Sequence, residues 1–210
     1  MKLQLLLHTG SLLLLINAIL YLKASATRKS LNLFTAYLWT IFMIQGLSFL
    51  LAYYKMNNLY LSHFYFIVQF ILLSLFYREV LVRNVYKKLV TAFLALVLGT
   101  LSLQYVLQPG LYYTFNIFEI VLTSLSLVAY SILYFYESLG ERKKLLYINS
   151  GIFLYLLSST LLFASGNIMP GLEKKINKFI WIINAVLYII YQVLIFMEWY
   201  KNLNAKERTL

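Results

Sequence analysis

The chain has 210 residues, of which 62% are hydrophobic and 12% charged, and its mean hydropathy is +0.77. Soluble domains carry about 25% charged and about 45–50% apolar residues, so a soluble domain of this length could not bury so much apolar surface. The formal net charge is +11, but the basic residues lie in short clusters between apolar segments, so we predict no nucleic-acid partner. Because the chain has no cysteine, disulfides and thiolate chemistry are excluded.

Seven apolar segments follow one another along the chain, with Pro109 and Pro170 lying between segments beside glycine. A bilayer core about 30 Å thick is crossed by about 20 helical residues, and each segment is close to that length. The sequence therefore predicts an all-α integral membrane protein, a single seven-transmembrane-helix bundle over residues 1–210. The predicted spans are 3–22, 31–53, 59–77, 89–107, 111–136, 145–165 and 179–200.

Lysine and arginine are distributed unequally between the two sides of this bundle. Thirteen of them flank the side that contains the C-terminus. The other side carries five, namely Lys2, Lys55, Lys174, Lys175 and Lys178. Cytoplasmic loops are enriched in basic residues, which predicts a plasma-membrane protein with its N-terminus outside and its C-terminus in the cytoplasm. The absence of cysteine and of a glycosylation sequon favours a bacterial inner membrane.

The first apolar segment also has features of a secretory signal peptide. Lys2 precedes an apolar stretch, and Ala24-Ser25-Ala26 has the small-x-small pattern of a cleavage site. Cleavage would leave six spans and place the most basic loops outside, and His8 interrupts the apolar stretch. We therefore expect residues 1–26 to be retained as the first span.

Glu119 is the one glutamate that the spans place at membrane depth, since the other six lie in loops or at span ends. It lies eight residues into span 111–136, or ~12 Å deep at 1.5 Å per residue. An ionisable residue at such depth marks a functional site by default, although small polar residues also join packed helices. Polar residues at spacings of three and four share its helix face: Asn116, Thr123, Ser126 and Tyr130.

Other spans carry polar side chains at about the same level, ~5–15 Å below the outer surface. This shared depth predicts a polar cavity that opens outward. We take as candidate ligand-binding residues Glu119, Asn116, His8, Gln45, Gln69, His63, Ser158, Ser159 and Asn184. The alternatives are that the two histidines reach interfacial water and that the amides serve as interhelical hydrogen bonds.

No catalytic residue, cofactor or metal site is predicted. His8, His63 and Glu119 could supply three zinc ligands only from three separate spans, and they form no local metal-binding motif. The last span has no lysine between residues 179 and 198, which excludes a retinal Schiff base there. Enzymatic activity is therefore not predicted.

These features favour a receptor-like or partner-binding membrane module that senses a small ligand or lipid. Because residues 201–210 are too few for a catalytic domain, this interpretation requires a cytoplasmic or membrane protein partner in addition to the lipid bilayer. A small-solute or proton-coupled transporter is an alternative, weakened because no proline breaks a span. A membrane-embedded lipid-modifying enzyme is a second alternative.

Overall fold

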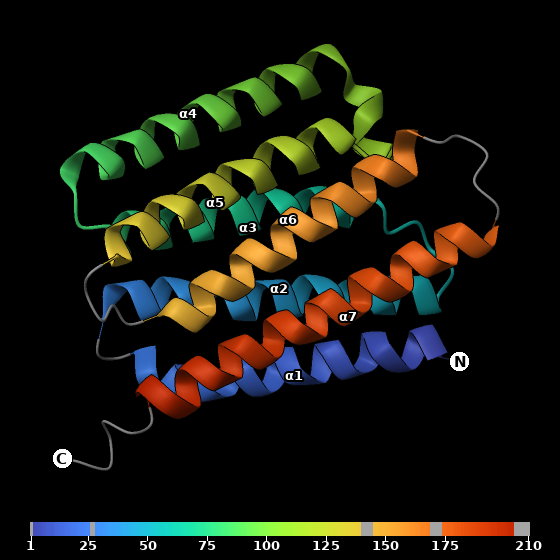
Figure 1. The fold of residues 1–210 in the computed structure, drawn as a ribbon. Coiled ribbons are helices and arrows are strands. Elements are labelled where there is room, and N and C mark those ends of the chain that lie inside the picture. The colour runs from blue at the N-terminus through green and yellow to red at the C-terminus, as the bar shows by residue number, and fades with distance from the viewer. Residues whose placement is uncertain (1, 26–27, 140–144, 169–173, 204–210) are drawn as a thin grey trace.

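The computed structural model describes residues 2–25, 28–139, 145–168 and 174–203. These residues form helices joined by short connections and contain no strand (Figure 1). Pro170 and the basic residues 142–144 lie outside the described residues. The elements are α1 (Lys2–Ser25), α2 (Lys29–Tyr53), α3 (Tyr60–Val80), α4 (Asn84–Leu107), η1 (Pro109–Tyr113), α5 (Ile117–Ser138), α6 (Leu146–Ile168), α7 (Lys174–Glu198) and η2 (Trp199–Leu203).

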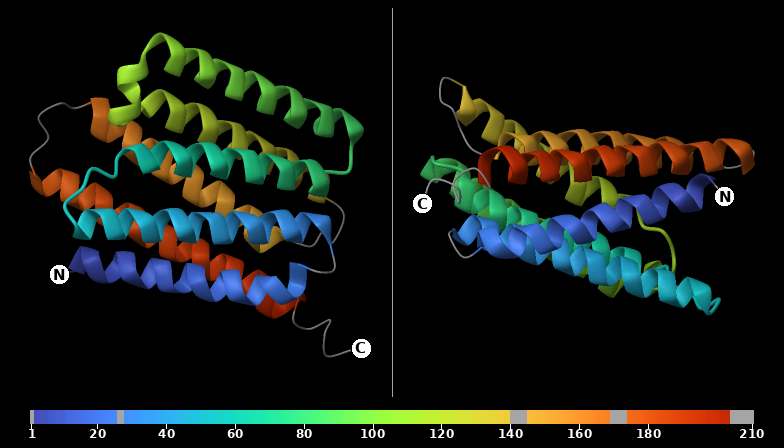
Figure 2. Two further views of the ribbon diagram at one scale, coloured as in Figure 1. Left: turned by 180° about the vertical axis from the view of Figure 1, so that it is seen from behind. Right: turned by 90° about the horizontal axis from the view of Figure 1, so that it is seen from below.

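Seven of these helices are long and apolar enough to cross a membrane, which confirms the predicted number of candidate spans and the all-α class. The two termini lie at opposite ends of the bundle, as expected for an odd number of passes (Figure 2). We call the end at which α1 begins the N-end, and the opposite end the C-end. The loops α2–α3 and α4–α5 lie at the N-end, together with the start of α7.

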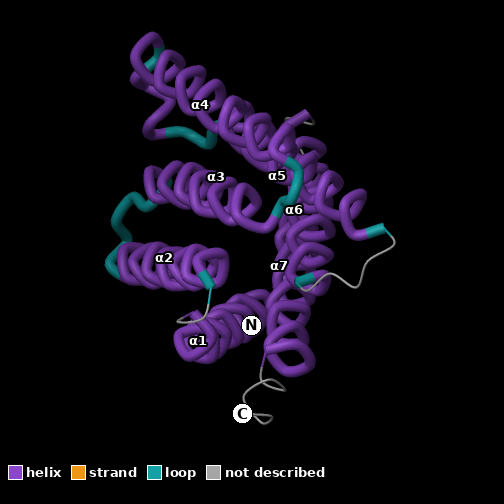
Figure 3. The backbone as a smooth tube through the Cα atoms, turned by 90° about the vertical axis from the view of Figure 1, so that its left-hand side faces the viewer, coloured by secondary structure: helices purple, strands orange, loops and turns teal. Residues whose placement is uncertain are grey.

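Six helices form a closed ring in which each packs against two neighbours, in the order α1, α2, α3, α5, α6 and α7. The seventh helix, α4, lies outside this ring against α3 and α5 (Figure 3). Its apolar window is the least buried of the seven, and Val90, Val97 and Leu101 are its buried residues. Most of the α4 surface is therefore free to contact lipid or another helix.

Hydrogen bonds between buried side chains join helices that are distant in sequence. Asn17 on α1 donates to the Gln192 backbone and side-chain oxygens on α7, at 2.9 and 3.0 Å. The Tyr77 hydroxyl on α3 donates to Asn149 Oδ1 on α6 at 2.7 Å. Within a bilayer such bonds hold helices together because apolar contact alone gives little preference for protein over lipid.

Two glycines allow large rings to approach the backbones of α1 and α6. A Cβ atom on Gly10 would lie 2.9 Å from the Tyr188 ring, and one on Gly151 would lie 2.7 Å from the Tyr191 ring. Side chains essentially never make contacts so short, so any larger residue would push these tyrosines away. The two glycines thus fix the position of α7 against α1 and α6.

The beginnings of α4 and α5 differ from the predicted spans. α4 begins at Asn84 rather than at residue 89, and α5 begins at Ile117 rather than at residue 111. Pro109 and Gly110 instead open the short helix η1, and the Asn116 side chain caps α5 by accepting the Glu119 backbone N–H at 3.3 Å. Glu119 therefore lies in the first turn of α5, nearer the N-end than the predicted depth.

Candidate functional site

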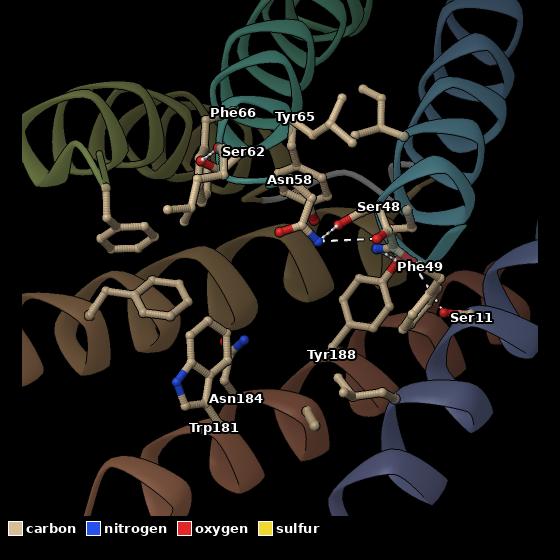
Figure 4. A pocket seen from close by; sticks show the side chains of 18 of the residues that line it. Ser11, Ser48, Phe49, Asn58, Ser62, Tyr65, Phe66, Trp181, Asn184 and Tyr188 are labelled. Atoms are coloured by element: carbon tan, nitrogen blue, oxygen red, sulfur yellow. Dashed lines mark hydrogen bonds between the residues drawn. The ribbon is translucent and has the colours of Figure 1, made fainter. Parts of the chain in front are cut away.

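A cavity of about 380 Å³ lies between the N-end halves of α1, α2, α3, α6 and α7 (Figure 4). We call it the ring pocket, because all five helices belong to the six-helix ring. More than half of its lining residues are aliphatic or phenylalanine and tryptophan side chains, so the cavity is less polar than the sequence predicts. The polar lining consists of Ser11, Gln45, Ser48, Asn58, Ser62, Asn184 and the tyrosines Tyr65, Tyr155 and Tyr188.

Some of the polar groups in the ring pocket are already hydrogen-bonded to one another. Gln45 donates through Nε2 to the Tyr188 hydroxyl at 3.0 Å and accepts from Ser11 Oγ at 3.3 Å. Asn58 donates to Ser48 Oγ at 2.9 Å (Figure 4). By contrast, the buried Oδ1 atom of Asn184 has no hydrogen-bond partner among the described residues. Because Asn184 lines the cavity, a turn of its side chain would let a ligand with a hydroxyl or amide proton satisfy this acceptor.

A layer of tyrosines forms the bottom of the ring pocket, and we call Tyr37, Tyr155, Tyr188 and Tyr191 the tyrosine floor. Tyr155 and Tyr188 line the cavity near the middle of α6 and α7. Tyr155 stacks on Tyr191 with ring centroids 5.4 Å apart and planes inclined by 3°. The Tyr191 hydroxyl in turn donates to that of Tyr37 at 3.2 Å, and both of these rings are buried. The described lining includes no residue from the C-end side of this layer.

The described lining of the ring pocket also includes no aspartate, glutamate, histidine, lysine or arginine. A charged ligand would lose its hydration on entry without gaining a counter-charge, which is costly in an apolar surrounding. The lining can instead hold an uncharged molecule through aromatic contact and a few directed hydrogen bonds.

A separate cluster of titratable side chains joins α3, α4 and α5 near the N-end. His63 Nδ1 lies 3.1 Å from Glu119 Oε2 and 2.8 Å from the Tyr105 hydroxyl. The Tyr105 hydroxyl also donates to Glu119 Oε2. The three groups thus meet at one point, and we call them the His–Tyr–Glu cluster. Because histidine and tyrosine can each donate or accept a hydrogen bond, the hydrogen bonds of the cluster can be arranged in more than one way.

The surroundings of the His–Tyr–Glu cluster are almost closed to solvent. Glu119 is 0% exposed and His63 is 3% exposed. Asn116 donates to Gln104 Oε1 at 3.1 Å and thereby links the start of α5 to the end of α4. Glu119 Oε1 and His63 Nε2 have no partner in the part of the chain that the structure describes. Such buried polar atoms are costly when left unpaired, which makes them candidates for binding a ligand or a proton.

The residues predicted for a single cavity are divided by the structure among several places. Glu119 and His63 belong to the cluster and Asn116 donates to its Tyr105 hydroxyl at 3.4 Å, whereas Gln45 and Asn184 line the ring pocket. The others line neither: His8 is exposed beside Phe49, Gln69 is buried with Oε1 unpartnered among the described residues, Ser158 is half-buried, and Ser159 donates to the Leu156 carbonyl.

The sequence predictions omit the tyrosines that matter most here. Tyr105 completes the His–Tyr–Glu cluster, while Tyr155 and Tyr188 form the inner boundary of the ring pocket. Tyrosine is common at membrane interfaces, so its presence near a span end gives no specific signal. The one usable signal is that Tyr155, Tyr188 and Tyr191 lie well inside their spans, where the hydroxyl needs a partner.

Within the described residues, no group of three or more His, Asp or Glu side chains could hold a metal ion. Comparison of the chain with known protein families, curated proteins and solved structures finds no match.

Proposed function

We propose that this chain is a receptor-like membrane module that binds a small, uncharged, amphipathic ligand in the ring pocket and relays the event to a protein partner at the C-end. The observation that carries the proposal is the cavity itself. Its volume of about 380 Å³ lies within the range of about 300–1,000 Å³ typical of small-molecule sites. Its mostly apolar lining with a few polar groups is also typical of such sites.

The tyrosine floor could transmit the effect of ligand binding in the ring pocket to the C-end. Tyr188 lines the pocket, receives a hydrogen bond from Gln45 and lies on α7, the helix that also bonds to Asn17 of α1. The C-end of α7 carries Glu198, whose carboxylate accepts the backbone N–H of Leu145 ahead of α6. A ligand that displaces Tyr188 would move α7 and so alter contacts at the opposite end of the bundle.

The proposed orientation places the ring pocket outside and the C-end in the cytoplasm, as the distribution of lysine and arginine predicts. Reporter fusions test this directly. We expect an enzyme active only in the cytoplasm to be active when fused after Leu210, and an enzyme active only outside to be active when inserted at Gly110. Activity of the outside reporter at Leu210 would contradict the orientation.

Ligand entry can be measured through Trp181, which lines the ring pocket. In a protein with Trp39→Phe and Trp199→Phe, Trp181 is the remaining tryptophan and can be excited selectively over tyrosine, since the chain has three tryptophans. We expect the neutral quencher 4-bromobenzyl alcohol to quench this fluorescence saturably. The charged 4-bromobenzoate should quench weakly because the pocket offers it no counter-charge.

The variant that tests the hydrogen bond between the ligand and Asn184 is Asn184→Leu, which keeps the volume of the side chain but removes the unpaired acceptor. We expect it to weaken the binding of 4-bromobenzyl alcohol by about threefold to tenfold, the usual value of one net hydrogen bond. Ser138→Ala at the C-end is the control and should leave quenching unchanged. Equal quenching by the alcohol and the benzoate, or no effect of Asn184→Leu, would refute the proposed site.

A proton-coupled transporter is the second candidate, and the His–Tyr–Glu cluster is the observation that favours it. A buried carboxyl hydrogen-bonded to a histidine and a tyrosine can take up and release a proton as its surroundings change. Transport would also require a path from the ring pocket past the tyrosine floor. Uptake of a solute into sealed vesicles, with loss of uptake in Glu119→Gln, would favour this candidate over the receptor.

A further inference from the structure

A second cavity lies on the opposite face of α3 from the ring pocket. Its volume is about 520 Å³ and five of its seven described lining residues are aromatic. Its lining residues are His63, Phe64, Ile67, Tyr105, Pro109, Tyr112 and Tyr113. None of them lines the ring pocket, so α3 presents one face to each cavity. We call the second cavity the aromatic pocket.

Most ring pairs of the aromatic pocket meet at large angles, whereas His63 and Tyr112 are inclined by only 26°, at a centroid distance of 5.9 Å. Tyr112 is inclined by 89° to Tyr113, at a centroid distance of 5.4 Å, and by 85° to Phe64, at 6.5 Å. His63 and Tyr105 are likewise inclined by 73°. Tyr113 and Phe64 are 65% and 47% exposed, so the pocket can be reached from outside the bundle.

The wall of this pocket is backed by a buried carboxyl group. Glu119 Oε2 is hydrogen-bonded to both His63 and Tyr105, and each of these two residues lines the cavity. Glu119 is also the only acidic residue that the structure describes in the N-end half of the bundle. The aromatic pocket therefore combines several π faces with one nearby carboxyl group.

We propose that the aromatic pocket binds an organic ammonium group. Aromatic rings set around a cavity attract a quaternary or alkylated ammonium through their negative faces, and a bulky cation of this kind loses little hydration on entering. Glu119 supplies the counter-charge behind the ring wall. This site is independent of the ligand proposed for the ring pocket, which lies on the other face of α3 and carries no charge.

The competing occupant is a lipid acyl chain, which would also fill an aromatic cavity at a helix surface. An acyl chain is uncharged and gains nothing from the carboxyl group of Glu119 behind the ring wall. An ammonium group gains from the same carboxylate. Charge dependence of binding therefore distinguishes the two occupants.

Choline is the direct probe, and 3,3-dimethyl-1-butanol is its uncharged isostere. Calorimetry on the full chain in a maltoside detergent, which has no ammonium group, should show saturable choline binding. We expect the isostere to bind at least tenfold more weakly. Equal binding of the two compounds, or no choline binding at all, would overturn the proposal.

Tyr113 is the most suitable residue to substitute, because its side chain is exposed and its removal should not affect folding. Tyr113→Leu should weaken choline binding by about threefold to tenfold, whereas Tyr113→Phe should retain it because the π face remains. Tyr136→Leu removes an exposed tyrosine at the C-end and is the matched control. Glu119→Gln should also weaken choline binding. Unchanged affinity in both Tyr113→Leu and Glu119→Gln would contradict the assignment.

The ammonium group could belong to a membrane lipid or to a free amine, and the lipid surroundings separate these sources. In nanodiscs of phosphatidylcholine, a lipid headgroup in the pocket would compete, so free choline should bind more weakly than in nanodiscs of a neutral galactolipid. Equal choline affinity in both nanodiscs assigns the pocket to a free amine. Either result requires a pocket that binds ammonium.

Discussion

Two glutamates at opposite ends of the bundle are equally buried but have different partners. Glu119 near the N-end and Glu198 at the C-end are each 0% exposed. Both oxygens of Glu198 accept backbone N–H groups at the start of α6, from Leu145 and Tyr147, each at 2.9 Å. Glu119 instead meets the side chains of His63 and Tyr105 through one oxygen, and its other oxygen has no described partner.

The difference lies in what the partners are able to do. A backbone N–H can only donate, so Glu198 must offer two acceptors at all times, and its role is to cap α6 and join it to α7. Histidine and tyrosine can each donate or accept, so the groups around Glu119 can exchange protons without breaking the cluster. Burial alone therefore does not distinguish the two carboxyl groups, whereas the kind of partner does.

The largest expected effect belongs to Glu198→Gln. The amide keeps one oxygen acceptor but turns an NH₂ donor toward the other backbone N–H, which loses its partner. Leu145 also has a φ of 73°, a conformation that a non-glycine residue holds only with outside support. We expect the free energy of unfolding in detergent to fall by about 2–3 kcal/mol.

Glu79→Gln is the matched control for this measurement, because Glu79 also lies toward the C-end but pairs with Lys29 at the surface, at 2.8 Å. Lys29 is 75% exposed, and such pairs contribute about 0–1 kcal/mol. If Glu198→Gln were no more destabilising than Glu79→Gln, the capping role of Glu198 would be wrong.

The spans could be predicted from the sequence because membrane insertion depends on the length and composition of each segment by itself. The start of α5 could not, since apolar content continues through Leu111 and Tyr112 while Pro109 and Gly110 favour the separate turn η1. Asn116 can be recognised in the sequence as a polar residue. Its position as the N-cap of α5 cannot, because that position depends on where the η1 turn ends. One such shift moved Glu119 to the first turn.

The candidate site could be predicted only in part, because it depends on contacts between helices. Depth predicts Glu119 and His63 as site residues, helical spacing predicts Asn116, and the structure brings them together through Tyr105 of α4. The depth of each residue in the membrane could not show that α3 separates this cluster from Gln45 and Asn184. That separation depends on which face of α3 packs against which helix. For the same reason, the sequence could not show that Glu198, a glutamate at the end of a span, is buried and caps α6.

The smallest expected effect on stability belongs to Glu119→Gln, although this residue is as buried as Glu198. An amide oxygen at the position of Oε2 can still accept hydrogen bonds from Tyr105 and from His63 Nδ1, and the NH₂ group then takes the place of Oε1, which has no described partner. We therefore expect the free energy of unfolding to change by less than about 1 kcal/mol. Unfolding of Glu119→Gln and Glu198→Gln side by side in the same detergent measures the contrast. Equal losses in the two variants would mean that Glu119 is a structural group like Glu198, and the partners that distinguish it would then have no functional meaning.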